Sequence, residues 1–313
     1  MSAFTEANRK AFDEMSATYN SKQWQIDLSN QVATALQARK DWLGAQWTTP
    51  DSDTDIRLLD YACGTGSITK ALGPHVSTIR GIDLSENMVQ KYNETALTSG
   101  LSREQAHAVV GDLCGEAIPP TLLGPEWYNF DIAVIGLGFH HFENPALAAK
   151  RLGERLRPGS GVLVIVDFLP FDHRKDQGSK EGAGNFPDMQ HTIKHNGFTP
   201  EHLRDLYTAA GFEDFDIVAL KQPAVMELKS GTVQRTMFVA KGRKVATAWQ
   251  KLSTWLGGMQ DWAAGGVKVD RRDEHEWEPG FSTGGAVWNI GKQKDEDYDA
   301  FKQQAKPKAW SGF

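Results

Sequence analysis

The chain has 313 residues and carries 34 Lys and Arg against 40 Asp and Glu, a formal net charge of −6. Its hydrophobic content of 40% and charged content of 24% are typical of a globular protein with one large or two modest domains. The acidic balance disfavours a protein whose main surface binds nucleic acid or an anionic membrane.

The first residues and the two cysteines bear on where the protein works. Residues 1–15 contain charges and lack an apolar h-region, so no secretory signal is expected. No stretch approaches ~18 continuous apolar residues, so no membrane span is expected either. Cys63 and Cys114 lie in core-like motifs rather than in a disulfide framework, which favours a reducing, cytoplasmic compartment. The sequence does not indicate an oligomeric state.

Residues 4–47 carry apolar side chains at helical spacing and predict a pair of helices. Two interpretations are open. The helices pack on the domain as ordinary core elements, or they form a lid that closes over a pocket, with Tyr19 and Trp24 facing inward. The polar segment 48–55, TTPDSDTD, predicts a boundary after them.

The most informative stretch begins with an apolar run, Ile56–Tyr61, of the length of a buried strand. The loop ACGTG and a helix start at Ser67 follow at once, which is a nucleotide-binding arrangement. A dinucleotide fingerprint would need a third glycine, and a phosphate loop would need GK[ST]. Asp60, inside the strand, suits an amino-bearing ligand. These features point to S-adenosylmethionine, which has an ammonium, a carboxylate, a ribose and a sulfonium.

Two further strands end in acidic residues. Thr78–Asp83 places Asp83 about 20 residues beyond the glycine loop, where a carboxylate can accept hydrogen bonds from both ribose hydroxyls. Ala106–Val110 is followed by Asp112 and Leu113. Asp112 could accept a hydrogen bond from an adenine amino group while Leu113 packs on the ring.

Four strand–helix alternations predict a parallel, doubly wound sheet. A later helix and a pair of antiparallel strands, joined by a turn near Ser230-Gly231, complete the domain. The remaining predicted strands span 130–137, 161–168, 212–222 and 233–241, and the helices between them span 144–157 and 199–211.

The segment 169–198 interrupts this alternation with polar residues, glycines and three histidines, His173, His191 and His195. Long insertions in compact domains are usually functional or disordered. The three histidines could bind a metal by residue type alone. No carboxylate or cysteine completes a recognisable ligand spacing, so no metal site is expected.

The C-terminal part, residues 245–313, holds six of the ten tryptophans. Helical spacing from Ala248 to Trp262 predicts a core-docking helix, followed by an irregular wrap or partial disorder. The chain is thus divided into a helical lid (1–48), a ligand-binding core with the 169–198 insertion over its pocket (49–243) and a Trp-rich extension (244–313).

Five segments in this order resemble the motifs of class I S-adenosylmethionine-dependent methyltransferases, the group that includes the ubiquinone/menaquinone-type enzymes. They are LLDYACGTGSIT, GIDLSENM, GDL, DIAVIGLGFHHF and LRPGSGVLVIVDF. The resemblance covers roughly residues 4–242. It implies a Rossmann-like, doubly wound α/β fold whose seven-stranded sheet has the order 3-2-1-4-5-7-6, with the last strand antiparallel. It also implies S-adenosylmethionine as cofactor and a small organic acceptor as substrate.

The resemblance also implies roles for individual residues. Gly64 and Gly66 approach the methionine end of the cofactor, and Asp83 takes the ribose. Gly136-Leu137 lies beside the sulfonium, and Tyr19 closes over the methionine carboxylate. The cofactor-binding residues expected are Tyr19, Asp60, Ala62, Gly64, Gly66, Asp83, Leu84, Met88, Gly111, Asp112, Leu113, Gly136 and Leu137.

Methyl transfer requires the acceptor atom to be held in line near ~3 Å, and a base where that atom must lose a proton. His140, just past the fourth strand, is the first candidate for this base, with a structural hydrogen bond as the alternative. His195, in a segment resembling H-x-GF, is the second. Trp24, His141 and His191 are expected to contact the substrate.

Two other functions remain open from the sequence. One is a protein that keeps this fold and binds or shapes a small molecule without methyl transfer. The other is a protein or RNA methyltransferase, which the absence of a basic stripe and of an NPPY-like motif disfavours. The acceptor atom, whether oxygen, nitrogen, carbon or sulfur, is not identified, because one fold serves many chemistries.

Overall fold

The computed structural model describes residues 1–49, 55–171, 189–228, 231–248 and 252. The helix predicted from Ala248 to Trp262 lies outside the described residues, apart from isolated positions at its start. His173 and most of the predicted insertion lie outside them as well.

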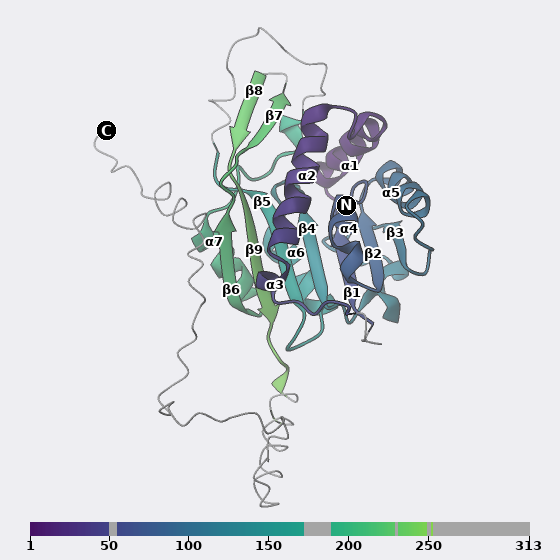
Figure 1. The fold of residues 1–313 in the computed structure, drawn as a ribbon, viewed down its shortest axis with the longest axis vertical. Helices are drawn as coiled ribbons and strands as arrows, with labels where there is room; N and C mark the ends of the chain where they lie inside the picture. Colours follow the sequence, from purple (N-terminus) through teal and green to yellow (C-terminus); the bar gives the residue numbers. More distant parts are fainter. Residues whose placement is uncertain (50–54, 172–188, 229–230, 249–251, 253–313) are drawn as a thin grey trace, which may run out of the picture.

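A seven-stranded sheet forms the centre of the protein, in the order β3-β2-β1-β4-β5-β9-β6 (Figure 1). The first five of these strands are parallel, and β9 runs antiparallel to both β5 and β6. This confirms the predicted order 3-2-1-4-5-7-6 with the last strand reversed. The strands are β1 Arg57–Tyr61, β2 Thr78–Asp83, β3 Ala106–Val110, β4 Ile132–Gly136, β5 Val162–Phe168, β6 Phe212–Ala219 and β9 Met237–Lys244.

Helices cover both faces of this sheet. The two faces carry separate apolar clusters, one including α2, α4 and α5 and the other including α6 and α7. All seven residues of β5 are buried, which explains why its sequence is apolar and β-branched apart from Asp167. The longer helices are α1 Ala3–Met15, α2 Gln23–Ala38, α4 Ser67–Leu72, α5 Glu86–Thr98, α6 Pro145–Arg155 and α7 Pro200–Ala209.

The helix starts follow the capping pattern of the sequence. The Ser85 hydroxyl accepts a hydrogen bond from the Met88 N–H at the start of α5, and Thr199 does the same for α7. Proline occupies the first turn of α6 and α7, where its missing N–H costs nothing. Short elements complete the chain, namely α3 Lys40–Leu43, η1 Ser16–Thr18, η2 Gly73–His75, η3 Pro120–Leu122, η4 Pro125–Trp127, η5 Phe139–His141 and η6 Gln190–Thr192.

The region after β6 differs from the prediction of two simple strands. A separate two-stranded sheet, β7 Ala224–Leu228 and β8 Gly231–Arg235, stands between β6 and β9. The predicted strand 233–241 is in fact two strands that meet at Thr236, whose carbonyl accepts from the Leu169 N–H at 2.9 Å. The sequence VQRTMFVAK has no glycine or proline at this point, so no turn signal marks the change of partner. Ser230, in the predicted turn, lies outside the described residues.

The N-terminal helices and the β7–β8 hairpin gather at one end of the sheet (Figure 1). The helix α2 crosses in front of the strands and packs against α4 and β7. The helix α1 packs against α5. This end of the sheet carries the carboxyl ends of the parallel strands, where open α/β sheets bind their ligands. Within the described ranges, no helix has the length and apolarity needed to cross a bilayer.

Candidate functional site

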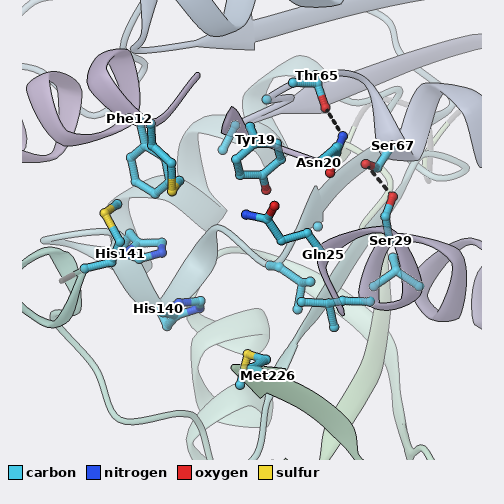
Figure 2. Close-up of a pocket in the computed structure, with 18 of the residues that line it drawn as sticks. Phe12, Tyr19, Asn20, Gln25, Ser29, Thr65, Ser67, His140, His141 and Met226 are labelled. Carbon is cyan, nitrogen blue, oxygen red and sulfur yellow. Dashed lines mark hydrogen bonds between the residues drawn. The ribbon is translucent and has the colours of Figure 1, made fainter. Parts of the chain in front are cut away.

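A cavity of about 430 Å³ lies at the carboxyl end of the sheet. Its walls come from the loop after β1, the end of β4, the helices α1 and α2 and the β7–β8 hairpin (Figure 2). This volume is within the range of small-molecule sites, about 300–1,000 Å³. The predicted inward-facing residues Tyr19 and Trp24 both line the cavity.

The glycine loop forms the floor of the cavity through Ala62, Gly64 and neighbouring residues. Gly64 has a φ of +50°, and a Cβ added there would meet nothing within 4 Å. Gly66 has a φ of +92°, and its added Cβ would lie 3.2 Å from the Tyr92 ring. Gly64 therefore leaves space for a ligand, whereas Gly66 serves the turn and the packing of α4.

The far side of the floor is formed by Gly136 and Leu137, at the end of β4. Leu137 has a φ of +59°, a left-handed conformation that is uncommon for a branched side chain. Its N–H is satisfied by the Val166 carbonyl at 2.8 Å. Strained backbone held in this way is often found at ligand sites.

Asp83 ties the end of β2 to the glycine loop. Its Oδ2 accepts from the Gly64 N–H at 2.8 Å, and its Oδ1 accepts from the Ser85 N–H at 2.9 Å. Burial raises the pKa of Asp83, while these amide hydrogen bonds lower it in part. Each carboxylate oxygen has a second lone pair, so Asp83 can still accept hydrogen bonds from ligand hydroxyls.

Asp60 is enclosed beneath the loop and does not line the cavity. Its Oδ2 accepts from the Thr69 hydroxyl at 3.0 Å, and its Oδ1 has no hydrogen-bond partner among the described residues. Burial raises the pKa of Asp60 to about 7. A buried oxygen of this kind is normally satisfied by a ligand or an ordered water.

The residues predicted to hold adenine lie outside this cavity. Met88 and Leu113 are fully buried, and Asp112 Oδ1 accepts from the Cys114 N–H at 2.7 Å and the Tyr61 hydroxyl at 3.3 Å. The cavity thus lies on the side where the methionine end of the cofactor and the acceptor are expected. The predicted adenine-side residues that do not line it are Leu84, Met88, Gly111, Asp112 and Leu113.

Two hydrogen bonds join the N-terminal region to the glycine loop and the start of α4. The Asn20 amide donates to the Thr65 hydroxyl at 2.9 Å, and the Ser29 hydroxyl donates to the Ser67 hydroxyl at 2.7 Å (Figure 2). These bonds hold α2 and the residues before it over the cavity, and Phe12 and Met15 of α1 line it as well.

Two adjacent histidines form one wall (Figure 2). The Nδ1–H of His140 donates to Asp167 Oδ1 at 2.8 Å, and the His140 backbone N–H donates to Asp167 Oδ2 at 3.0 Å. The Nδ1–H of His141 donates to the Thr192 carbonyl at 2.9 Å. Burial and the neighbouring His140 lower the pKa of His141 well below its usual value, so His141 is neutral near pH 7.

His191 and His195, the other predicted histidines, do not line the cavity. The Lys194 and His195 N–H groups both donate to the His140 carbonyl, at 3.0 and 3.1 Å. This fixes the segment so that Ile193 faces the cavity instead. Of the residues expected at the acceptor pocket, Tyr19, Trp24, His140 and His141 line the cavity, and His191 and His195 do not.

Several residues of this site were missed in the sequence. Asp167 had a usable signal, because an acid interrupts the apolar run of β5 just before its end. Gln25, Met226 and Arg235 also line the cavity. They had no such signal, because their positions depend on how α2 and the hairpin pack. In the parts of the chain that the structure describes, no cluster of three or more His, Cys, Asp or Glu could hold a metal.

This sheet order, with β9 reversed and a glycine loop open to a cavity, defines a class I S-adenosylmethionine-dependent methyltransferase. Residues 30–216 match the family model of a methyltransferase domain, and the chain belongs to that family. The cofactor of this class is S-adenosylmethionine. The open space at Gly64 leaves room for this cofactor, and the lone pairs of Asp83 can accept hydrogen bonds from its ribose hydroxyls.

Curated relatives cover only part of the chain. It is 30% identical over 177 residues to an uncharacterized methyltransferase of Schizosaccharomyces pombe, which is 54% of this chain and 58% of the relative. It is 32% identical over 118 residues to demethylmenaquinone methyltransferase of Staphylococcus aureus, 36% of this chain and 44% of the relative. The chain thus spans about half the length of these relatives.

Among solved structures, the YcgJ protein from Bacillus subtilis superposes with a TM-score of 0.50 at 14% identity. The match covers 69% of this chain and all of that chain. At this identity the similarity supports the fold alone.

Proposed function

We propose that this protein transfers a methyl group from S-adenosylmethionine to a small organic acceptor, with His140 as the general base. The observation that carries the proposal is the orientation of His140 on the cavity wall. Its Nδ1 is held by the fully buried Asp167, which leaves Nε2 as the ring nitrogen for a proton from the acceptor.

The cofactor supplies an electrophilic methyl group on a sulfonium. The chain contributes the surfaces that hold and orient the two reactants. The open backbone at Gly64 and the turn at Gly136-Leu137 provide the floor, and Asp83 provides acceptors for ribose hydroxyls. Tyr19 closes the opposite side and lies near Asp83, whose charge adds to burial in raising the pKa of Tyr19.

Asp167 acts through His140. A carboxylate on Nδ1 fixes the ring orientation and the tautomer, and it stabilises the imidazolium that forms when Nε2 takes a proton. His141 packs beside His140 as a neutral ring, and the centroids of the two imidazole rings lie 4.0 Å apart. The Asn8 amide donates to the His141 carbonyl at 3.1 Å, which ties α1 to this wall.

A small acceptor fits this site better than a macromolecule. Residues 1–48 act as a lid in this proposal, because the Asn20–Thr65 and Ser29–Ser67 hydrogen bonds hold them over the cavity. The roofed space has room for an organic molecule beside the cofactor and not for a folded protein or an RNA helix. The free thiols of Cys63 and Cys114 favour a reducing compartment such as the cytoplasm.

Two measurements test the proposal. Calorimetry with S-adenosylhomocysteine should give saturable binding to the wild type and to His140→Gln. A panel of hydroxylated and amine-bearing acceptors with labelled cofactor should then give turnover that His140→Gln lowers on the order of 10²–10⁴-fold. The exposed His202→Gln is the matched control and should keep full turnover. Cofactor binding without turnover on any acceptor would favour a binding protein of this fold.

A further inference from the structure

Arg235 is a buried cation on the wall of the cavity. It is the last residue of β8, it is 5% exposed, and its side chain lines the cavity. The guanidinium carbon lies 3.7 Å from the centre of the Phe171 ring and 5.6 Å from that of Phe168. These ring contacts hold the side chain at the cavity before any ligand arrives.

We infer that Arg235 binds an ionised acid group of the methyl acceptor, a carboxylate in the simplest case. This inference rests on the proposed function, because it names the class of acceptor for the same cavity. The acceptor would be a hydrophobic carboxylic acid whose acid group lies at Arg235 and whose methylated atom lies at His140.

The position of Phe168 relates the two ends of this acceptor. Its ring lies 5.5 Å from that of His140 and 5.6 Å from the guanidinium carbon of Arg235. The proton-accepting histidine and the cation are therefore both next to one aromatic ring. A molecule the size of one substituted ring or a short chain can reach both residues at once.

The charges around the cavity favour an anion over a cation. None of the described residues that line the cavity is Asp, Glu or Lys, and Arg235 is the one among them with a fixed charge. The guanidinium contacts the Phe168 and Phe171 rings, and Arg235 has further interactions within the protein. Its five N–H donors in a planar fork allow it to keep these and to bind a carboxylate as well. An ammonium at the same place would be repelled.

The rest of this end of the cavity is apolar. Apolar side chains share the cavity with the cation, namely Met226 and Leu228 of the hairpin, Ile193 and Met189 of the segment before α7, and Phe168 of β5, whose ring lies next to the guanidinium. An acceptor with an apolar body and a single acid group would bury its body against these side chains. Its acid group would pair with Arg235. Sugars and small polar amines lack this combination.

The test uses the full-length protein saturated with S-adenosylhomocysteine, and calorimetry with three acids, benzoate, cinnamate and octanoate. Each acid is compared with its primary amide, which has nearly the same shape and no charge. At least one acid should bind about tenfold more tightly than its amide. The reason is that a hydrogen bond to a charged carboxylate is stronger than one to a neutral amide. Arg235→Met should remove this preference, and Arg235→Lys should keep part of it.

Arg243→Met is the control, because Arg243 is a half-exposed arginine of β9 paired with Asp214 and Glu213 on the surface. It should bind the acids as the wild type does. Equal binding of acids and amides, no binding of any of the three acids, or a preference that survives in Arg235→Met would each overturn the inference.

Binding of S-adenosylhomocysteine checks that each variant folds. If Arg235→Met fails this check, Arg235→Lys replaces it, and a preference for the acids as large as that of the wild type overturns the inference. The readout is equilibrium binding and requires no turnover. If the wild type methylates an acceptor but binds acids no more tightly than amides, the inference about Arg235 is wrong and the proposed function stands. If the wild type binds acids more tightly than amides but methylates no acceptor, the proposed function is wrong and the inference about Arg235 stands.

Discussion

The carboxylate of Asp13, on α1, accepts a hydrogen bond from the Ser85 hydroxyl at 2.6 Å. The N–H of Ser85 in turn donates to Asp83 at 2.9 Å. The N-terminal helix is therefore joined through one residue to the acid expected to hold the ribose. The same helix reaches His141 through Asn8, so it contacts both the cofactor side and the histidine wall.

We predict that Asp13→Ala weakens binding of S-adenosylhomocysteine by about tenfold, because a charged hydrogen-bond partner of Ser85 contributes roughly 1.5–3 kcal/mol. Calorimetry measures this directly. Asp27→Ala, which removes an exposed carboxylate of α2, is the control and should leave the affinity unchanged. Unchanged affinity in Asp13→Ala would mean that α1 does not position Asp83.

The link between Asp167 and His140 leads to a second prediction. Asp167→Asn keeps the shape of the side chain and removes the charge that stabilises the imidazolium. Turnover should fall on the order of 10²–10⁴-fold, with the affinity for S-adenosylhomocysteine nearly unchanged. Thermal unfolding distinguishes this role from a structural one. A purely structural role for Asp167 would lower Tm and the affinity for S-adenosylhomocysteine together with turnover.

The two glycines of the loop should respond differently to alanine. At Gly64 the new methyl group meets no protein atom within 4 Å, so Gly64→Ala should fold, with a backbone cost of roughly 1–2 kcal/mol at positive φ. It should lose cofactor affinity because the methyl group enters the cavity. At Gly66 the methyl group approaches Tyr92 at 3.2 Å, so Gly66→Ala should lose more stability. Thermal unfolding together with calorimetry separates the two effects, and equal stability losses would contradict this assignment.

Asp60 gives a prediction about pH. Its pKa in the folded protein is raised to about 7 by burial, above the ordinary value of 3.8. The neutral form of Asp60 stabilises the folded protein. This contribution is fully present below about pH 3.8 and is lost as the pH rises through about 7. Asp60→Asn stays neutral and keeps an oxygen acceptor for Thr69. The Tm of this variant relative to the wild type should therefore be higher at pH 8 than at pH 5.

The exposed Asp27→Asn is the control for this experiment, because its carboxylate lies on the surface of α2. Its Tm difference from the wild type should be the same at both pH values. A Tm difference for Asp60→Asn that does not change between pH 5 and pH 8 would show that Asp60 is ionised in the folded protein throughout this range.

Local pattern predicted most of the main sheet. The glycine loop, the acid that ends β2 and the Ser85 and Thr199 caps each lie within a few residues of the signal that reveals them. The prediction for the region after β6 was wrong in part, because no glycine or proline separates β8 from β9, although the two strands pair with different partners. Pairing depends on distant strands and leaves no local signal.

In the candidate site, too, local pattern predicted some of the residues and tertiary packing decided the others. The residues of the glycine loop, Asp83 and His140 were predictable because strand, loop and helix periods put them at the carboxyl edge of the sheet. Ile193, rather than His195, faces the cavity because two backbone hydrogen bonds to the His140 carbonyl set the register of that segment. Such a register cannot be obtained from residue types.

The sequence by itself determined the class of fold, the place of the glycine loop and the presence of His140 on the cavity wall. These follow from short-range periodicity and from the conformations that glycine and capping residues allow. The tertiary structure alone decided that Asp167 holds His140 and that Arg235 reaches the same cavity. Both relationships join strands that are distant along the chain, and only the packing of β4, β5 and the β7–β8 hairpin brings those side chains within contact distance.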